Sequence, residues 1–377
     1  MSGETEEMIR REPRMNRRTL YIAIGAVAVV AVIIGAGALT GWFGGGPPPI
    51  TLVGAGATFP YPLISKWSIE YHARTGVQIN YQSIGSGGGI QQITAKTVDF
   101  GASDAPLTAT ERAAAPGLLH IPETLGAVTF VYNLPSIASG LNLTGSVIAD
   151  IFLCRITRWN HANIATLNPS RSLPDRDIFV VHRSDGSGTT FVWTDYLSKL
   201  SPTWASQVGK GKSVNWPCGL GAKGNEGVAG VVAGNPYAAG YVELAYAEIQ
   251  RMTYGAVKNA AGNFVLPSLN STAAAAVAAI LPNGEDSWTN VSIVNAPGAL
   301  SYPIASFTYL LVYRELNVFG ASMTQVKAKA LVDFVWWVVH DGQAFSSALL
   351  YPPLPASVLG ADERTIGLIT FNGQALR

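Results

Sequence analysis

Charged residues are scarce in this sequence, and so are histidine and cysteine. Only 13% of the 377 residues are Asp, Glu, Lys or Arg, whereas 48% are hydrophobic, and the net charge is +1. Beyond the first 18 residues, basic and acidic side chains balance, so no basic excess is available to bind a nucleic acid backbone. The hydrophobic composition excludes a disordered chain, and the length favours two domains.

The scarcity extends to residues that mark catalytic and cofactor sites. The five histidines lack the spacing of metal ligands, so we expect no metal and no cofactor. Two glycine-rich windows fail as nucleotide loops, because Phe59 replaces the third glycine of a dinucleotide motif and Ser206 replaces the first glycine of a P-loop. Ser187 lacks the flanking pattern of a hydrolase nucleophile, although His182 is near in sequence. We therefore expect no enzyme.

The N-terminal region contains a long uncharged run. Residues 20–43 carry no charge and are long enough to span a bilayer as a helix, whereas residues 1–19 are polar and contain five arginines. Positive charge on this flank predicts a cytoplasmic N-terminus and an extracellular body. The alternative is a cleaved signal peptide, because Ala36-Gly37-Ala38 has the spacing of a cleavage site. Residues 44–50 form a Gly/Pro linker.

Two features of the body are compatible with an extracellular location. Asn-X-Ser/Thr sequons begin at Asn142, Asn270 and Asn290. Cys154 and Cys218 could form one disulfide in an oxidising compartment. Two buried free thiols are the alternative, and the sequence alone leaves both open.

From Ile50 onward, strand-like segments alternate with helical ones, which is the pattern of an α/β fold. The expected strands cover residues 50–56, 77–86, 98–108, 127–134, 177–185 and 238–247. The expected helices cover residues 57–75, 87–97, 145–156, 188–200 and 323–345.

Three of the strand-to-helix turns share the same chemistry, a hydroxyl beside backbone amides that have no helical partner. The residues at these turns are Thr58, Phe59, Ser86, Ser187, Gly188 and Thr189. Such amides bind anions, and parallel strands bring their turns to one edge of a sheet. With Arg183, which Asp185 can hold in place, the turns predict a donor shell for a tetrahedral oxyanion.

Asp104 is an unexpected component of such a site, because a carboxylate repels an anion. It fits if the ligand carries a proton that Asp104 can accept, as hydrogen phosphate does and sulfate at neutral pH does not. A site built around one ligand hydroxyl can reject the analogue that lacks it by about 10⁴–10⁵-fold. The alternative is that Asp104 caps the turn before Pro106.

Five segments resemble the phosphate-binding proteins of phosphate ABC importers, a family of periplasmic substrate-binding proteins. They are GAGATFPYPLISKW, NYQSIGSGGGIQQI, DFGASDAPLT, VVHRSDGSGTTFVWTDYL and VNWPCGLGAKGNEGVAG, in the family's order. The resemblance covers about residues 51–351. It implies the two-domain α/β fold of type II periplasmic binding proteins, with phosphate in the cleft between the domains.

Carried over by motif position, the resemblance also implies the ligands of phosphate. They are Thr58, Phe59, Ser86, Asp104, Arg183, Ser187, Gly188 and Thr189. Asp104 would accept the phosphate proton, and Asp185 would hold the guanidinium of Arg183. The chain departs from the family at Gly87, where a second serine is common, at His182, and in its two cysteines. None of these departures removes an implied ligand.

Together these observations predict a membrane-anchored, extracellular protein that captures inorganic phosphate and delivers it to the permease subunits of an ABC importer. We expect a monomer that closes around phosphate by a hinge near residues 124–128 and 298–303. The expected parts are a cytoplasmic tail (1–19), a transmembrane helix (20–43), a linker (44–50), domain I (51–125 and 303–377) and domain II (126–302). The alternatives are a binding protein for a sulfate-like oxyanion, a phosphate sensor, and a phosphoester hydrolase that uses Ser187 with His182.

Overall fold

The computed structural model describes residues 49–377. The predicted cytoplasmic tail and transmembrane helix at residues 1–43 therefore lie outside the described part of the chain. None of the helices between residues 49 and 377 combines the length and the apolar character needed to cross a membrane.

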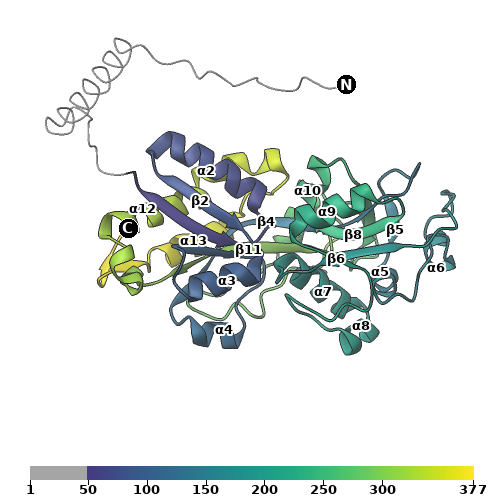
Figure 1. Ribbon diagram of the computed structural model, residues 1–377, viewed down its shortest axis with the longest axis horizontal. Helices are drawn as coiled ribbons and strands as arrows, with labels where there is room; N and C mark the ends of the chain where they lie inside the picture. The colour runs from purple at the N-terminus through teal and green to yellow at the C-terminus, as the bar shows by residue number, and fades with distance from the viewer. Residues whose placement is uncertain (1–48) are drawn as a thin grey trace, which may run out of the picture. The chain divides into compact units, whose positions relative to one another are not determined.

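Strands and helices alternate along the described chain, as expected for an α/β fold (Figure 1). The strands are β1 (Thr51–Gly56), β2 (Gln78–Ser83), β3 (Phe100–Ser103), β4 (Leu118–Tyr132), β5 (Leu141–Leu143), β6 (Phe179–Arg183), β7 (Leu220–Ala222), β8 (Ala238–Glu243), β9 (Thr253–Lys258), β10 (Phe264–Val265), β11 (Ala305–Tyr313), β12 (Thr370–Phe371) and β13 (Gln374–Ala375). The helices are α2 (Tyr61–Thr75), α3 (Ser86–Thr94), α4 (Ala109–Ala114), α5 (Gly145–Phe152), α6 (Ala162–Ala165), α7 (Gly188–Leu200), α8 (Pro202–Gln207), α9 (Gly224–Gly234), α10 (Leu244–Ile249), α11 (Leu269–Ala276), α12 (Gln325–Val339) and α13 (Ala356–Ile366), with 3₁₀ helices η1 (Leu316–Ser322), η2 (Asp341–Phe345) and η3 (Ser347–Leu349).

The main sheet is mixed, with both parallel and antiparallel pairs of strands. Its strand order is β2-β1-β3-β11-β4-β8-β6-β7. β1 runs parallel to β2 and β3, and β6 runs parallel to β7 and β8. β11 is antiparallel to both β3 and β4, and β8 is antiparallel to β4. The parallel pairs therefore form two separate groups, with antiparallel strands between them.

β4 connects these two groups because it changes its partner along its length. Up to Ala127 it pairs with β11, and from Val128 it pairs with β8. Figure 1 shows β4 and β11 between one group of helices that includes α2, α3 and α12 and another that includes α7 and α9. The change of partner falls inside the predicted hinge at residues 124–128. The domain boundaries themselves stay a prediction.

Local sequence explains where the helices next to the predicted site begin. Ser187 caps α7, because its side chain accepts a hydrogen bond from the amide of Thr190. Gly85 precedes α3 with a φ of 88°, a left-handed conformation that glycine adopts without strain. Pro60 ends the turn that leads into α2, and its missing N–H costs no helical bond there.

Several elements differ from the prediction, and the expected strand at 127–134 begins much earlier, as β4 at Leu118. The expected strand at 238–247 ends at Glu243, which caps helix α10. The expected helix at 323–345 ends at Val339 and continues as the 3₁₀ helix η2. β11 was not expected at all, although it is a central strand of the sheet.

Cys154 and Cys218 form a disulfide, with their Cα atoms 6.3 Å apart. It ties the residues after α5 to the loop that precedes β7. Trp216 of this loop packs against Phe152 of α5 and stacks on His182 of β6. The disulfide and these aromatic contacts therefore hold the 209–219 loop against the sheet.

Candidate functional site

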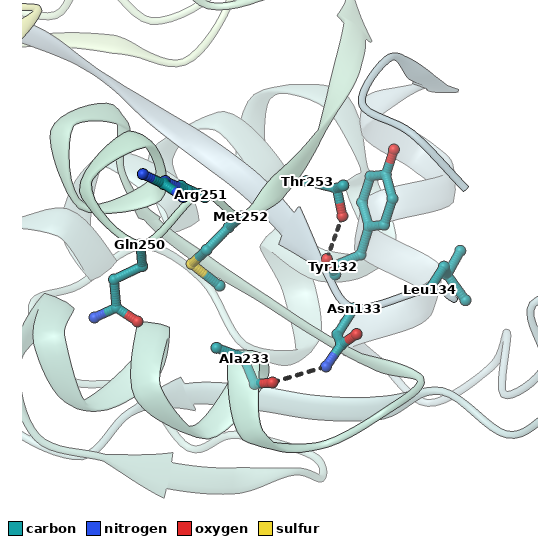
Figure 2. Close-up of a pocket in the computed structure, with 8 residues that line it drawn as sticks. All are labelled: Tyr132, Asn133, Leu134, Ala233, Gln250, Arg251, Met252 and Thr253. Atoms are coloured by element: carbon teal, nitrogen blue, oxygen red, sulfur yellow. Dashed lines mark hydrogen bonds between the residues drawn. The ribbon is translucent and has the colours of Figure 1, made fainter. Parts of the chain in front are cut away.

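A pocket of about 250 Å³ lies at the end of β4, but it contains none of the predicted ligands (Figure 2). Two of its polar side chains bond to backbone carbonyls of the protein. Thr253 Oγ1 donates to the carbonyl of Tyr132, and Asn133 Nδ2 donates to the carbonyl of Ala233. This pocket is therefore not the candidate site.

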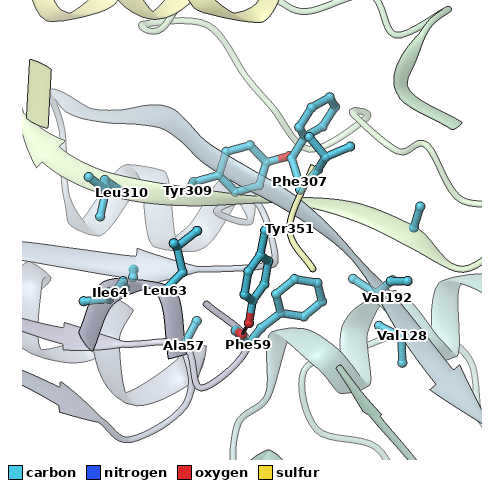
Figure 3. Packing of buried hydrophobic residues seen from close by; sticks show 14 of the residues in the cluster. Ala57, Phe59, Leu63, Ile64, Val128, Val192, Phe307, Tyr309, Leu310 and Tyr351 are labelled. Carbon is cyan, nitrogen blue, oxygen red and sulfur yellow. Dashed lines mark hydrogen bonds between the residues drawn. The ribbon is translucent and has the colours of Figure 1, made fainter. Parts of the chain in front are cut away.

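The predicted ligands instead lie together and buried where the ends of several strands meet helix N-termini. The exposed fraction of Arg183 is 3%, those of the six other side chains are no larger, and Gly188 is buried as well. Figure 3 shows Phe59 beside Tyr351, whose hydroxyl donates to the carbonyl of Phe59 at 2.7 Å. This contact fixes the turn before α2.

Asn225, the second residue of α9, joins two of the turns. Its side-chain amide donates to Thr58 Oγ1 at 2.7 Å and to Thr189 Oγ1 at 3.1 Å. Its own carbonyl oxygen accepts from the amide of Glu243 at 2.9 Å, which sets the orientation of the amide group. Asn225 therefore holds the first residues of α7 against the turn before α2.

Ser86 joins the other two parts of the cluster. Its Oγ accepts from the amide of Asp104 at 3.2 Å and from the amide of Gly188 at 3.1 Å. Gly188 has to be glycine for this contact, because a Cβ there would lie 2.4 Å from both Ser86 Oγ and Asp104 Oδ2. The start of α3, the loop after β3 and the start of α7 thus meet within hydrogen-bonding distance.

The neighbours of three hydroxyls decide where their protons point. Thr58 Oγ1 accepts from the amide and the side chain of Asn225, Ser86 Oγ accepts two amides, and Thr189 Oγ1 accepts from Asn225 and from Arg183. A hydroxyl has two acceptor lone pairs and one proton. Because both lone pairs of each oxygen are used, each hydroxyl is left with a proton to donate.

Arg183 is fixed by its partner and still has donors to spare. Its Nε donates to Asp185 Oδ1 at 2.8 Å, its Nη2 to Asp185 Oδ2 at 2.5 Å, and its Nη1 to Thr189 Oγ1 at 3.4 Å. Burial alone would raise the pKa of Asp185, but the hydrogen bonds from Arg183 outweigh burial. The pKa of Asp185 therefore lies below its usual value. A guanidinium has five N–H groups, so two remain for a ligand.

Asp104 has a different environment on each side of its carboxyl group. Oδ1 accepts from the hydroxyl of Thr308 at 3.0 Å, and Oδ2 lies against Gly188. Burial raises the pKa of Asp104 to about 7, although Thr308, Arg183 and Ser86 act to lower it. A carboxyl group with this pKa can accept a proton near neutral pH, which suits the predicted role of Asp104.

Ser187 and His182 do not form the nucleophile and base of a hydrolase. The Ser187 hydroxyl caps α7, and the backbone amide of Ser187 donates to the carbonyl of Lys212. His182 Nδ1 lies 3.0 Å from the carbonyl of Arg183, and its ring stacks on Trp216. Within residues 49–377 no group of His, Cys, Asp or Glu side chains is arranged to hold a metal ion.

Four buried polar residues of this cluster were not predicted from the sequence: Asn225, Thr308, Glu123 and Glu243. Their exposed fractions are 0%. The sequence carried a usable signal for Asn225. It is the last residue of AKGN, a glycine-containing turn between the short strand β7 and helix α9, and several predicted ligands lie at turns of the same kind. Glu123 stands out as an acid within the apolar run of β4.

Comparison with known proteins agrees with this architecture. Residues 44–341 match a family model described as a PBP superfamily domain. A protein of Xylella fastidiosa named phosphate-binding protein PstS is 49% identical over 311 residues, which cover 82% of this chain and 83% of the relative. A protein of the same name from Methanocaldococcus jannaschii is 38% identical over 353 residues, 87% of this chain and 89% of the relative.

Solved structures share the fold. A high-affinity periplasmic phosphate-binding protein solved with phosphate is 21% identical, with a TM-score of 0.65, over 82% of this chain and 92% of that one. A phosphate-binding protein from Stenotrophomonas maltophilia is 20% identical with a TM-score of 0.63, over the same shares of the two chains. The chain therefore belongs to the PBP superfamily and, within it, to the PstS family of phosphate-binding proteins, a family of binding proteins rather than enzymes.

Proposed function

We propose that this protein captures inorganic phosphate outside the cytoplasm and delivers it to the permease of an ABC importer. The observation that carries the proposal is the fixed direction of the donors. Thr58, Ser86 and Thr189 each use both lone pairs within the protein and keep a proton to donate. The Ser86 proton also faces the Asp104 carboxyl, whose pKa it lowers, whereas those of Thr58 and Thr189, beside Arg183, are left to suit a tetrahedral oxyanion.

The helix N-termini add backbone donors to the same region. Within residues 49–377 the amides of Phe59 and Thr189 have no hydrogen-bond acceptor. Amides at the first turn of a helix have no helical partner and favour an anion. Recognition would thus depend on aimed donors rather than on net positive charge, since Arg183 is balanced by Asp185.

The carboxylate of Asp104 favours the binding of phosphate over that of a sulfate-like ligand. Phosphate near neutral pH keeps a proton that the carboxylate can accept, whereas sulfate would face an unpaired, buried carboxylate. The relatives from Xylella fastidiosa and Pasteurella multocida, 49% and 47% identical, are both named for phosphate binding.

Closure around the ligand is supported by bonds between the two predicted domains. The Thr58–Asn225 and Ser86–Gly188 bonds each join residues before 126 to residues after it. So does the ion pair between Glu111 of α4 and Lys212, with a nitrogen–oxygen distance of 2.5 Å. Opening the site would break all of these contacts, and rotation near the change of partner in β4 would permit it.

The N-terminal sequence supports a membrane anchor. The uncharged residues 20–43 with arginines on one flank would hold the binding domain at the outer face of the membrane, on the linker at residues 44–50. A full-length chain should then remain in the membrane pellet after alkaline carbonate extraction, and a chain lacking residues 1–43 should not. Release of the full-length chain by carbonate would contradict the anchor.

Calorimetric titration tests the ligand. The full chain, stripped of bound anion, is titrated with phosphate and then with sulfate at neutral pH. We expect saturable, one-to-one binding of phosphate and no heat of binding from sulfate. Equal binding of both anions would overturn the role of Asp104, and absence of phosphate binding would overturn the proposed function.

A further inference from the structure

The hydroxyl of Thr308 lies between two buried carboxyl groups. Thr308 Oγ1 is 3.0 Å from Asp104 Oδ1 and 3.2 Å from Glu123 Oε1. Thr308 belongs to β11, and Glu123 belongs to the neighbouring strand β4. A hydroxyl has a single proton, so it can donate fully to one carboxylate only. The second contact is a hydrogen bond only if the other carboxyl group is protonated and donates to Thr308 Oγ1.

Glu123 is the carboxyl group that is suited to hold this proton. Its Oε2 is buried and has no hydrogen-bond partner within residues 49–377, and no ion pair joins it to a basic side chain there. Asp104 has the favourable field of Arg183 and the nearby hydroxyl of Ser86. Burial and the charge of Asp104 raise the pKa of Glu123 to about 8, above that of Asp104. Near neutral pH, Glu123 donates to Thr308 and Thr308 donates to Asp104.

We infer that Glu123 is a positioning residue for phosphate: its proton turns the Thr308 hydroxyl toward Asp104 and keeps Asp104 as the acceptor of the ligand's proton. When Glu123 loses its proton to alkaline solvent, its charge lies beside Asp104 and opposes the bound anion. Phosphate is then released. This inference deepens the proposed function and rests on it.

The other titratable groups around Glu123 do not account for the same effect. Tyr81 of β2 faces Glu123, and burial raises its pKa well above the usual value, so it stays neutral throughout. Glu243, at the end of β8, faces Asp104 and bonds to the hydroxyl of Tyr351 at 2.9 Å. Burial raises the pKa of Glu243 well above its usual range. From η2, Gln343 contributes a neutral amide to the carbonyl of Glu123.

Glu123→Gln is the variant that tests the inference. Glutamine has the shape of protonated glutamic acid and can donate from Nε2 to Thr308, but it cannot ionise. Phosphate affinity of the full chain is measured by calorimetry from about pH 7 to about pH 9 for the wild type, for Glu123→Gln and for Glu248→Gln, a control at an exposed glutamate. Because the ionisation of phosphate and of Asp104 affects all three proteins, the ratio of their Kd values isolates Glu123.

We expect the wild type and Glu123→Gln to bind phosphate equally at pH 7. With a pKa of about 8, the ratio of wild-type Kd to that of Glu123→Gln should rise to about tenfold at pH 9. The wild type and Glu248→Gln should remain equal throughout. A ratio that stays constant, with phosphate still bound, would overturn this inference alone. Failure of all three proteins to bind phosphate at pH 7 would overturn the proposed function and this inference with it.

Two independent measurements separate the proton from a structural effect. The infrared difference spectrum between pH 7 and pH 9 should contain the carbonyl bands of protonated carboxyl groups in both proteins, because Asp104 also loses a proton in this range. The wild type should show one additional band, from Glu123, that Glu123→Gln lacks. Thr308→Ser, which keeps the hydroxyl, should bind phosphate at pH 7 like the wild type, whereas Thr308→Val should bind about tenfold more weakly or worse. Identical infrared difference spectra for the wild type and Glu123→Gln, or equal phosphate binding by both Thr308 variants, would contradict the role of the Glu123 proton.

Discussion

The hydroxyls of Thr58, Ser86 and Thr189 are donors because of their neighbours. Each oxygen accepts two hydrogen bonds, so its proton has one remaining direction. A hydroxyl on a surface turn can rotate to suit any ligand, but these three cannot do so without breaking bonds inside the protein. Pre-orientation of this kind reduces the ordering cost of binding.

Removal of Arg183 should have the largest effect on phosphate affinity among the single side chains of the site. Arg183→Ala deletes two donors and leaves the Asp185 carboxylate without its partner, so we expect the Kd for phosphate to rise by at least about a hundredfold. Arg183→Lys keeps the charge but not the paired geometry, so its Kd for phosphate should lie between those of the wild type and Arg183→Ala. Calorimetry would contradict this role if the alanine variant bound within about fivefold of the wild type.

Substitution of Asp104 should change the selectivity between phosphate and sulfate without disrupting the structure of the protein. Asp104→Asn cannot accept the ligand's proton, and its amide can donate to either anion, so the preference for phosphate over sulfate should fall by at least about a hundredfold at neutral pH. In the wild type, the acid form of Asp104 gains population as pH falls through about 7, so sulfate binding should appear in that direction. Titrations with both anions check this, and sulfate binding that is unchanged in Asp104→Asn would contradict it.

Among the elements, those with local signals were predicted and those with distant causes were not. Helix α7 begins and ends where the sequence placed it, at residues 188 and 200, because Ser187 caps it locally. β11 was missed, although the segment ASFTYLLVY is rich in aromatic and branched side chains, because its partners β3 and β4 lie more than 170 residues earlier in the chain. Asn225 was missed because its partners Thr58 and Thr189 are 167 and 36 residues away.

The ion pair between α4 and the 209–219 loop should add a modest amount to closure. Burial alone would raise the pKa of Glu111, but its bonds with Lys212 and Thr108 outweigh burial, so the pKa lies below its usual value. The ion pair is therefore present at neutral pH and is lost only when acid protonates Glu111. Lys212→Ala should therefore weaken phosphate binding by about two- to fivefold at neutral pH. Lys210→Ala, whose partner Asp195 lies in the same predicted domain, is the matched control.

A double-mutant cycle makes this prediction specific. If Lys212 acts through Glu111, then Lys212→Ala should have no effect on the Kd in a Glu111→Gln background. An equal loss of affinity from Lys212→Ala in both backgrounds would show that the ammonium group acts elsewhere.

At the scale of the whole molecule, β4 is the strand that pairs with both groups of elements. The predicted hinge lies where the partner of β4 changes from β11 to β8. The two ends of β4 can therefore move with different parts of the sheet. Small-angle X-ray scattering should show a smaller radius of gyration when phosphate is added to the stripped protein. Sulfate should leave the radius unchanged, and an identical radius with phosphate would contradict closure.

The position of β11 in the sheet has a consequence for synthesis of the chain. β11 lies between β3 and β4, yet it follows β4 by more than 170 residues. While the ribosome is still making the intervening segment, the facing edges of β3 and β4 have no partner, whereas β8 can already pair with β4. Unpaired strand edges promote association between chains. The nascent protein therefore depends on the late arrival of residues 305–313, and factors that protect exposed strand edges should matter most just before those residues emerge.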